Sequence, residues 1–210
     1  MVTICKFHQK TDAKYIAQIG KYGSMRKLIA KLKALLLYPL WFGKYGSHSL
    51  ILHPLQIDGA KNIQIGKRVY IQSHSWLAAM PLTGKTAELL IGNGCSLGHF
   101  NHIYATQSIV LENDVLTADK VYISDNQHTY TNVEVPIKEQ SIKQDKPVRI
   151  GQGSWLGENV CVIGANIGKH CVIGANSVVT KDIPDYSVAV GAPAKVVKQY
   201  NATTNQWEKV

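Results

Sequence analysis

The sequence predicts an all-β solenoid preceded by one short helix, and a six-residue period is the main reason. Between residues 150 and 193 an aliphatic residue recurs every six positions, with a single step of five. A glycine usually follows it, and a small residue lies four positions after it. This period fits neither the 3.6-residue turn of an α-helix nor the two-residue alternation of a lone strand. Each hexapeptide is better explained as one short strand and one corner. The aliphatic positions are Ile150, Leu156, Val162, Ile167, Ile173 and Val179.

A repeat of this kind has to stack in order to be stable. Three hexapeptides make a triangular coil of about 18 residues, and coils stack at the strand spacing of roughly 4.8 Å. The aliphatic residues then form columns in the core, while glycine is favoured at corners, where a Cβ would often clash. No hexapeptide can bury its apolar residue alone, so we expect stability to come from neighbouring coils.

The same period extends upstream. It begins near Ile57, is broken by an insertion over residues 81–88, resumes at Ile91 and continues without a slip to Val121. With the C-terminal run, this predicts roughly five coils. Residues 125–147 are polar and lack the period. A long excursion from a regular scaffold is more often functional than not, so we expect an active-site loop there.

Residues 24–38 predict an amphipathic basic helix, with Ser24 as its N-cap and Pro39 as its stop. Two interpretations remain open. Its apolar face packs on the first coil as a cap, or it lies in a membrane interface with lysines toward lipid phosphates. The predicted organisation is therefore a lead and helix over residues 1–50, a β domain over 51–194, and a short basic tail or helix over 195–210.

Composition narrows the class of protein and its partners. The 210 residues allow one main domain, and the formal charge of +9 predicts an acidic partner. The lysines are scattered and no reading motif occurs, so we expect no nucleic-acid binding. We also expect no secretory signal and no membrane-spanning segment. The cysteines show no CxxC spacing and are expected to be free thiols in a reducing cytoplasm. They are Cys5, Cys95, Cys161 and Cys171.

Residues 150–193, closing with SVVTKDIPDYSVAVGAPAKVVK, resemble the hexapeptide-repeat family. The resemblance implies a left-handed parallel β-helix and acyl transfer from acyl-coenzyme A. The segments GKYGSMRKLI, KVYISDNQH and NQWEKV also have counterparts in the lipopolysaccharide and capsule O-acetyltransferases. This implies transfer of acetyl from acetyl-CoA to a sugar hydroxyl during bacterial surface polysaccharide synthesis. It also implies a homotrimer, because the coenzyme lies in the groove between neighbouring subunits.

The resemblance assigns the general base to His128, at the junction of coil and loop. An imidazole suits this task because its ordinary pKa of about 6.5 lies near the working pH. Related enzymes often read Ser-Asp-His-Asn-His here, whereas this chain has Asn126 in place of the first histidine. Asp125 would orient the imidazole or bind the sugar, or else only stabilise the turn.

The remaining site residues also follow from the resemblance. The backbone N–H of Trp155 would face the thioester carbonyl while its ring walls the site, or the ring would only cover a corner. Lys181 and Lys195 would meet the nucleotide phosphates, or equally be ordinary solvated lysines. Pantetheine contacts are expected at Gly157, Ala175 and Ser177. Acceptor contacts are expected at Asn126, His99 and His102.

Three other interpretations compete with this one. His74, His99 and His102 suggest a zinc site like that of the β-helical carbonic anhydrases. The rest of that ligand pattern is missing, so we expect no metal. An enzyme of the same fold could act on a small molecule, such as an amino sugar, serine or an antibiotic; no long helical N-terminal domain of the serine enzymes is present. The third is a noncatalytic scaffold, in which His128→Ala would change no activity.

Overall fold

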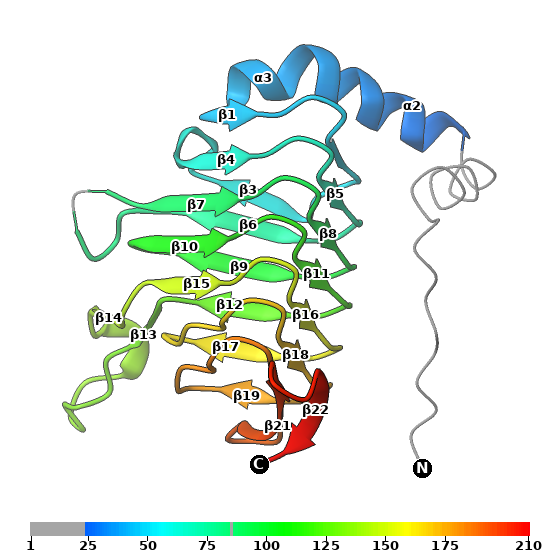
Figure 1. The fold of residues 1–210 in the computed structure, drawn as a ribbon. Helices are drawn as coiled ribbons and strands as arrows, with labels where there is room; N and C mark the ends of the chain where they lie inside the picture. Colours follow the sequence, from blue (N-terminus) through cyan, green and yellow to red (C-terminus); the bar gives the residue numbers. More distant parts are fainter. Residues whose placement is uncertain (1–23, 85) are drawn as a thin grey trace.

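The computed structural model describes residues 24–84 and 86–210 (Figure 1). Its strands form three main sheets, and the chain visits them in turn before it returns to the first. Neighbouring strands within each sheet are parallel, up to the last two strands of the second sheet. We call one passage through the three sheets a coil. The chain is therefore mostly β with short parallel strands, as the six-residue period predicts.

The strands are distributed over the sheets as follows. The first sheet holds β1 (Lys44–Tyr45), β4 (Ile63–Ile65), β7 (Glu88–Ile91), β10 (Ser108–Leu111) and β15 (Val148–Ile150). The second holds β2 (Leu50–Ile51), β5 (Tyr70–Ile71), β8 (Ser96–Leu97), β11 (Leu116–Thr117), β16 (Trp155–Leu156), β18 (Val172–Ile173), β20 (Ser187–Val190), β21 (Lys195–Asn201) and β22 (Gln206–Lys209). The third holds β3 (Gln56–Asp58), β6 (Trp76–Ala79), β9 (His102–Ala105), β12 (Tyr122–Ser124), β17 (Cys161–Ile163) and β19 (Val178–Val179). A 3-10 turn, η2 (Ala60–Asn62), precedes β4.

The aliphatic positions of the repeat stack in columns through the core. In the first sheet Ile91 is in register with Leu111, and Leu111 with Ile150. Parallel bridges continue this column to Ile167 and Ile183. All five side chains are buried, so each covers its neighbours in the coils on either side. The predicted core positions are confirmed.

Glycine is needed at the corners because stacked corners come very close together. A Cβ on Gly92 would lie 2.6 Å from the backbone carbonyl carbon of Glu112, and one on Gly151 would lie 2.4 Å from that of Gly168. Neither Gly92 nor Gly151 has a positive φ, whereas a residue such as Asp114 does. The expected need for glycine at corners is thus confirmed, and its cause here is close approach of the backbones.

The predicted helix exists, but it does not stop at Pro39. It comprises α2 (Ser24–Leu32), a π-helical turn η1 (Lys33–Leu37) and α3 (Tyr38–Trp41). Proline is tolerated in the first turn of a helix because the N–H that it lacks would be unbonded there. Pro39 therefore lies at the start of α3. Among the described residues, no helix is long and apolar enough to cross a bilayer.

The helix covers the first coil (Figure 1). Its leucine side chains do not make this contact, because they are exposed. Ala30, Tyr38 and Phe42 are buried, and Ala34 packs partly buried against the core. The ring of Tyr38 meets that of Phe42 edge-on, with ring centroids 5.4 Å apart. The interpretation in which the leucine face packs on the first coil is therefore wrong, because small residues and two aromatic rings make the contact instead. Exposed instead are Leu28, Ile29, Leu32, Leu35, Leu36, Leu37, Leu40 and Trp41.

Both ends of the β region differ from the sequence-based expectation. The first strand begins at Lys44, ahead of Ile57, and the third sheet has six strands where roughly five coils were expected. Residues 195–210, expected as a tail or helix, form β21 and β22, which add antiparallel strands to β20. The packing of Tyr200 against Trp207, with ring centroids 5.7 Å apart, holds this hairpin together.

Candidate active site

The predicted loop forms an arm at the corner where the third sheet passes to the first (Figure 1). It begins with β13 (Asn126–His128), directly after β12, and returns through β14 (Ile142–Gln144). The two strands pair antiparallel, and a 3-10 turn, η3 (Ile137–Glu139), lies between them. At the base of the arm the Gln127 side chain donates to both carboxylate oxygens of Asp145, at 3.0 and 2.9 Å. The loop is therefore a hairpin with a closed base.

His128 ends β13 and presents its imidazole to solvent. It is in register with Ile142 of β14, and beyond it the N–H of Thr129 donates to the carbonyl of Ser141 at 3.0 Å. The His128 side chain is exposed. The strand pairing therefore fixes its backbone and leaves its ring nitrogens accessible to an acceptor.

Asp125 is fully buried at the base of the arm. One carboxylate oxygen accepts hydrogen bonds from the backbone N–H of Thr106 at 2.8 Å and from its hydroxyl at 3.0 Å. The other accepts the N–H groups of Gln107 and Ser108, each at 2.8 Å. The Gln144 side chain donates to the Asp125 carbonyl at 2.7 Å. These contacts tie the arm to the corner of the previous coil, in agreement with the turn-stabilising alternative.

Asn126, predicted to touch the acceptor, is half-buried beside Asp125. Its side-chain amide donates to the Tyr104 carbonyl at 3.3 Å and to the Asp125 carboxylate at 3.1 Å. Its backbone N–H donates to the Ser124 hydroxyl at 3.1 Å. Both hydrogen bonds of the amide thus go to the protein, and they help to hold the first residue of β13.

Trp155 lies in β16, with 47% of its side chain exposed. Its backbone N–H donates to the Cys171 carbonyl of the next coil at 2.8 Å. The prediction that this N–H faces a thioester carbonyl is therefore wrong, because strand pairing uses the donor. The ring remains available as an outer wall on the second sheet, beside Leu116 in the strand above.

The predicted pantetheine residues lie at and after the corner between the second and third sheets. Gly157 and Ala175 follow β16 and β18, and a Cβ on Gly157 would lie 2.7 Å from the Ala175 nitrogen. Ser177 is buried, and its hydroxyl accepts the N–H of Gly191 at 3.1 Å. Gly157 and Ser177 thus have structural tasks, whereas Ala175 is exposed. The phosphate candidates, Lys181 and Lys195, are both exposed.

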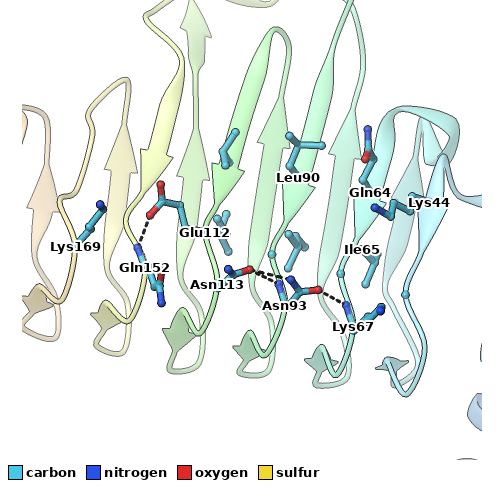
Figure 2. A pocket seen from close by; sticks show the side chains of 16 residues that line it. Lys44, Gln64, Ile65, Lys67, Leu90, Asn93, Glu112, Asn113, Gln152 and Lys169 are labelled. Carbon is cyan, nitrogen blue, oxygen red and sulfur yellow. Dashed lines mark hydrogen bonds between the residues drawn. The ribbon is translucent and has the colours of Figure 1, made fainter.

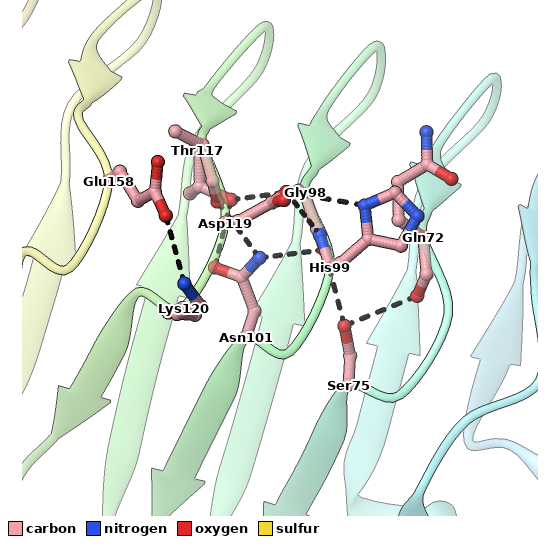
Figure 3. A network of polar contacts seen from close by, with 10 residues as sticks. Gln72, Ser75, Gly98, His99, Asn101, Thr117, Asp119, Lys120 and Glu158 are labelled. Carbon is pink, nitrogen blue, oxygen red and sulfur yellow. Dashed lines mark hydrogen bonds and ion pairs between the residues drawn. The ribbon is translucent and has the colours of Figure 1, made fainter.

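His99 lies at the same corner, two coils earlier. Figure 3 shows its ring beside Asp119, with Nδ1 3.3 Å from a carboxylate oxygen that also accepts the His99 N–H at 2.7 Å. Asn101 is buried behind it and donates to the Gly98 carbonyl at 2.7 Å. Below Asp119, Lys120 and Glu158 form an ion pair at 3.1 Å. This ladder of polar contacts joins His99 to the corner of Gly157.

His102 stands on the outer side of the third sheet, within an aromatic ladder. Its ring stacks on Trp76 with centroids 4.3 Å apart and meets Tyr122 edge-on at 5.2 Å. Burial lowers the pKa of His102, which favours the neutral ring. Its Nε2 atom is buried and has no hydrogen-bond partner among the described residues. The sequence signal for this ladder is an aromatic residue or histidine directly before the aliphatic residue in every third hexapeptide, as at Trp76, His102 and Tyr122.

The candidates therefore form two groups in one chain. His128, Asp125 and Asn126 lie at the corner between the third and first sheets, and His99, Gly157 and Ala175 lie at or near the corner between the second and third. The outer face of the third sheet, with His102, lies between the two groups. Within residues 24–84 and 86–210, no three His, Cys, Asp or Glu residues are placed to hold a metal ion. His74 instead stacks on Phe100, with centroids 5.0 Å apart.

A hollow of about 480 Å³ lies elsewhere, on the outer face of the first sheet (Figure 2). Lys44, Lys67 and Lys169 stand around it, and Asn93 and Asn113 form a hydrogen-bonded ladder along its edge. None of the predicted site residues lines it. Its lysines are spread over several coils, so this hollow does not gather groups for chemistry.

Part of the chain matches a known protein family. Residues 147–181 match a family model described as the hexapeptide repeat of succinyl-transferase. This stretch of the chain carries the hexapeptide repeat. The matched residues include Trp155, Gly157, Ala175 and Ser177, but not His128.

Two curated relatives of this chain carry acetyltransferase names. It is 42% identical over 137 residues to "Probable acetyltransferase Rv3034c" of Mycobacterium tuberculosis, a match that covers 65% of this chain and 44% of the relative. It is 38% identical over 128 residues to "Putative lipopolysaccharide biosynthesis O-acetyl transferase WbbJ" of Escherichia coli, covering 58% of this chain and 65% of the relative. The chain thus spans less than two thirds of the length of each.

Solved structures share the fold of this chain. AntD, an N-acyltransferase from Bacillus cereus in complex with dTDP and 3-hydroxybutyryl-CoA, matches with a TM-score of 0.67 and 18% identity over 80% of this chain and 88% of that one. The hexapeptide-repeat acetyltransferase VCA0836 from Vibrio cholerae, in complex with acetyl-CoA, matches with a TM-score of 0.56 and 20% identity over 92% and 93%. At these identities the similarity concerns the fold.

Proposed function

We propose that this protein is an O-acetyltransferase that moves acetyl from acetyl-CoA to a sugar hydroxyl in bacterial surface polysaccharide synthesis, for lipopolysaccharide O-antigen or capsule. The observation that carries the proposal is the exposed His128 on an arm whose base is pinned by the buried Asp125. The similarity to the Escherichia coli relative supports the class of acceptor. The Vibrio cholerae enzyme of the same fold supports the choice of coenzyme.

In the proposed reaction the chain needs one proton carrier. His128 takes the proton from the acceptor hydroxyl, and the resulting oxygen nucleophile attacks the thioester carbonyl carbon. The tetrahedral intermediate collapses, the C–S bond breaks, and the thiolate receives the proton from the imidazolium. No covalent enzyme intermediate forms. The Trp155 ring walls the site, while donors other than its own N–H face the oxyanion, since that N–H is bonded to Cys171.

The division of the candidates between two corners supports an oligomer. We infer that the three sheets are the faces of a left-handed parallel β-helix and that three copies associate as a homotrimer. Each groove would then combine His128 of one copy with the corner of Gly157 and Ala175 on its neighbour. Lys181 and Lys195 would contact the nucleotide phosphates, and His99 and His102 would face the acceptor.

We place the reaction in the cytoplasm, where acetyl-CoA is available. The described cysteines are all free thiols, in keeping with a reducing compartment. Burial raises the pKa of the Cys95 thiol to about 11 and also raises that of Cys171. Both thiols therefore stay protonated and act as small core residues.

The test is release of free thiol from acetyl-CoA by the purified protein, measured across a panel of saccharide acceptors. We expect acceptor-dependent release that His128→Ala abolishes. His170→Asn is the matched control: it removes another exposed imidazole, at a left-handed backbone position that asparagine tolerates. Equal rates in the wild type and His128→Ala would refute the base assignment. Absence of acetyl-CoA binding would favour a noncatalytic scaffold.

A second candidate keeps the fold and changes the acceptor to an amino sugar. It is favoured by AntD, an N-acyltransferase with a structure in complex with dTDP-4-amino-4,6-dideoxyglucose. The two functions are separated by the product, because an O-acetyl ester is cleaved by mild alkali and an N-acetyl amide is not. Nucleotide-linked amino sugars therefore belong in the same panel.

A further inference from the structure

The helix at the end of the coil stack leaves a large apolar surface uncovered. Leu28, Leu32, Leu35 and Leu36 follow one another at helical spacing, and all four are exposed. Leu35 has 73% of its side chain exposed and Leu36 has 64%. Single exposed leucines are ordinary, but a contiguous apolar surface of this kind marks an interaction site. We name it the leucine surface. It comprises Leu28, Ile29, Leu32, Leu35, Leu36, Leu40 and Trp41.

The leucine surface is not available to the core of its own chain. The helix already packs on the first coil through Ala30, Ala34 and Tyr38. Its end is fixed there by the Lys61 ammonium, which donates to the Leu40 carbonyl at 2.5 Å. The helix would have to turn over and break these contacts to bury its leucines. The leucine surface is therefore exposed, on the helix that lies at one end of the stack (Figure 1).

The charges around the leucine surface indicate what it binds. Lys31 and Lys33 are exposed and lie beside the leucines, and Lys44 is exposed just after the helix. No acidic residue occurs between Ser24 and Ile57. An apolar stripe bordered by lysines, with a tryptophan at one end, is the composition of a helix that lies in the interface of an anionic membrane.

A second copy of the chain fits the leucine surface less well. Pairing two such surfaces would bring Lys31 and Lys33 of one copy close to the same lysines of the other, with no acidic side chain on the helix to compensate. We propose that the leucine surface docks this protein on an anionic lipid bilayer, with the leucines and Trp41 in the headgroup boundary and the lysines at the lipid phosphates. The inference does not depend on the proposed acetyl transfer, because docking needs neither acceptor nor coenzyme.

The test is co-sedimentation of the full chain with vesicles of phosphatidylcholine alone and of phosphatidylcholine mixed with phosphatidylglycerol. We expect binding to the mixed vesicles that weakens with added salt. The double variant Leu35→Glu/Leu36→Glu should reduce the partition coefficient about tenfold or more, because it removes two apolar contacts and adds two negative charges.

The matched control is Leu82→Glu/Val210→Glu, which makes the same change of charge at apolar side chains that are 52% and 79% exposed, outside the leucine surface. It should bind as the wild type does. Equal loss in both double variants, or no binding of the wild type to mixed vesicles, would overturn the proposal. Thermal unfolding of both variants checks that they are folded, since the substituted side chains make little core contact.

Two further readouts identify the occupant directly. Brominated phosphatidylcholine in the mixed vesicles should quench part of the tryptophan fluorescence, and Trp41→Phe should abolish that part. Sedimentation velocity without vesicles reports the oligomeric mass. If Leu35→Glu/Leu36→Glu lowers that mass, the leucine surface joins copies of the chain and the lipid proposal is wrong.

Discussion

At the scale of single residues, the buried carboxylate of Asp125 is the most constrained group near the arm. It accepts three backbone N–H groups, a hydroxyl and the Asn126 side-chain amide, with no exposure to solvent. A buried acceptor placed among several donors is costly to replace, because any donor left unbonded keeps its full desolvation penalty. The sequence could place Asp125 close to His128 but could not reveal most of its hydrogen-bond donors, because these come from residues 106–108 of the preceding coil.

The substitution Asp125→Asn should destabilise the protein at the base of the arm. The new amide would direct an N–H at backbone N–H donors, so we expect a loss of about 1–3 kcal/mol in the free energy of unfolding. The proposed acetyl transfer should also fall, because the arm that carries His128 loses its anchor. Urea unfolding monitored by circular dichroism measures the first effect and thiol release the second.

The matched control is Asp119→Asn. The Asp119 oxygen accepts the backbone N–H of His99 at 2.7 Å, and at an equivalent corner position the Asn93 side-chain oxygen accepts the N–H of Lys67 at 2.8 Å. Asparagine can therefore keep this contact, and we expect a change within about 0.5 kcal/mol. Equal losses in the two variants would show that the donors around Asp125 are not what stabilises the arm.

At the scale of elements, the sequence predicts which strand positions are buried, but it does not predict which face of the helix packs on the core. The repeat located the buried positions from Ile91 to Val179, because each lies in a fixed slot of the hexapeptide. The repeat could not show which helix face packs on the core. Ala30 and Ala34 lie at helical spacing just as the leucines do, and the two faces differ only in the size of their side chains. Nor could it show that the Trp155 N–H is bonded to Cys171, since that depends on which strand lies in the next coil.

The corner glycines give a prediction at this scale. A Cβ on Gly92 would lie 2.6 Å from the backbone of Glu112, whereas a Cβ on Gly84 would have no atom within 4 Å. We expect Gly92→Ala to destabilise the protein by about 1–3 kcal/mol, because stacked backbones cannot move apart at one corner alone. Gly84→Ala should be neutral, or more stable by about 0.4–1 kcal/mol through the unfolded chain.

Thermal unfolding of the two alanine variants under identical conditions measures both effects. A Gly92→Ala midpoint equal to that of Gly84→Ala would mean that the corners can separate, and that glycine is not required there by close approach.

At the scale of the whole molecule, stacked coils make stability a sum of neighbour contacts. A residue in the middle of a column is covered from two sides, whereas a residue at the end is covered from one. The helix and the β21–β22 hairpin lie at opposite ends of the stack (Figure 1). Each covers a terminal coil, whose residues would otherwise have neighbours on one side only. The sequence offered a helical cap as one of two interpretations, but missed the hairpin because residues 195–210 are mostly exposed and carry no repeat.

Isoleucine-to-alanine substitutions in the column from Ile91 to Ile183 test whether a residue covered from two sides contributes more stability than one at the end of the column. Ile150 is fully buried between Leu111 and Ile167, whereas Ile183 is at the end of the column and 5% exposed. We expect Ile150→Ala to lower the free energy of unfolding by about 2–5 kcal/mol, because the cavity is enclosed by neighbours that cannot collapse into it. Ile183→Ala should cost clearly less, because the end of the stack can relax. Urea titration of both variants gives the comparison, and a larger loss at Ile183 would mean that the end of the stack, rather than its middle, limits the stability of the protein.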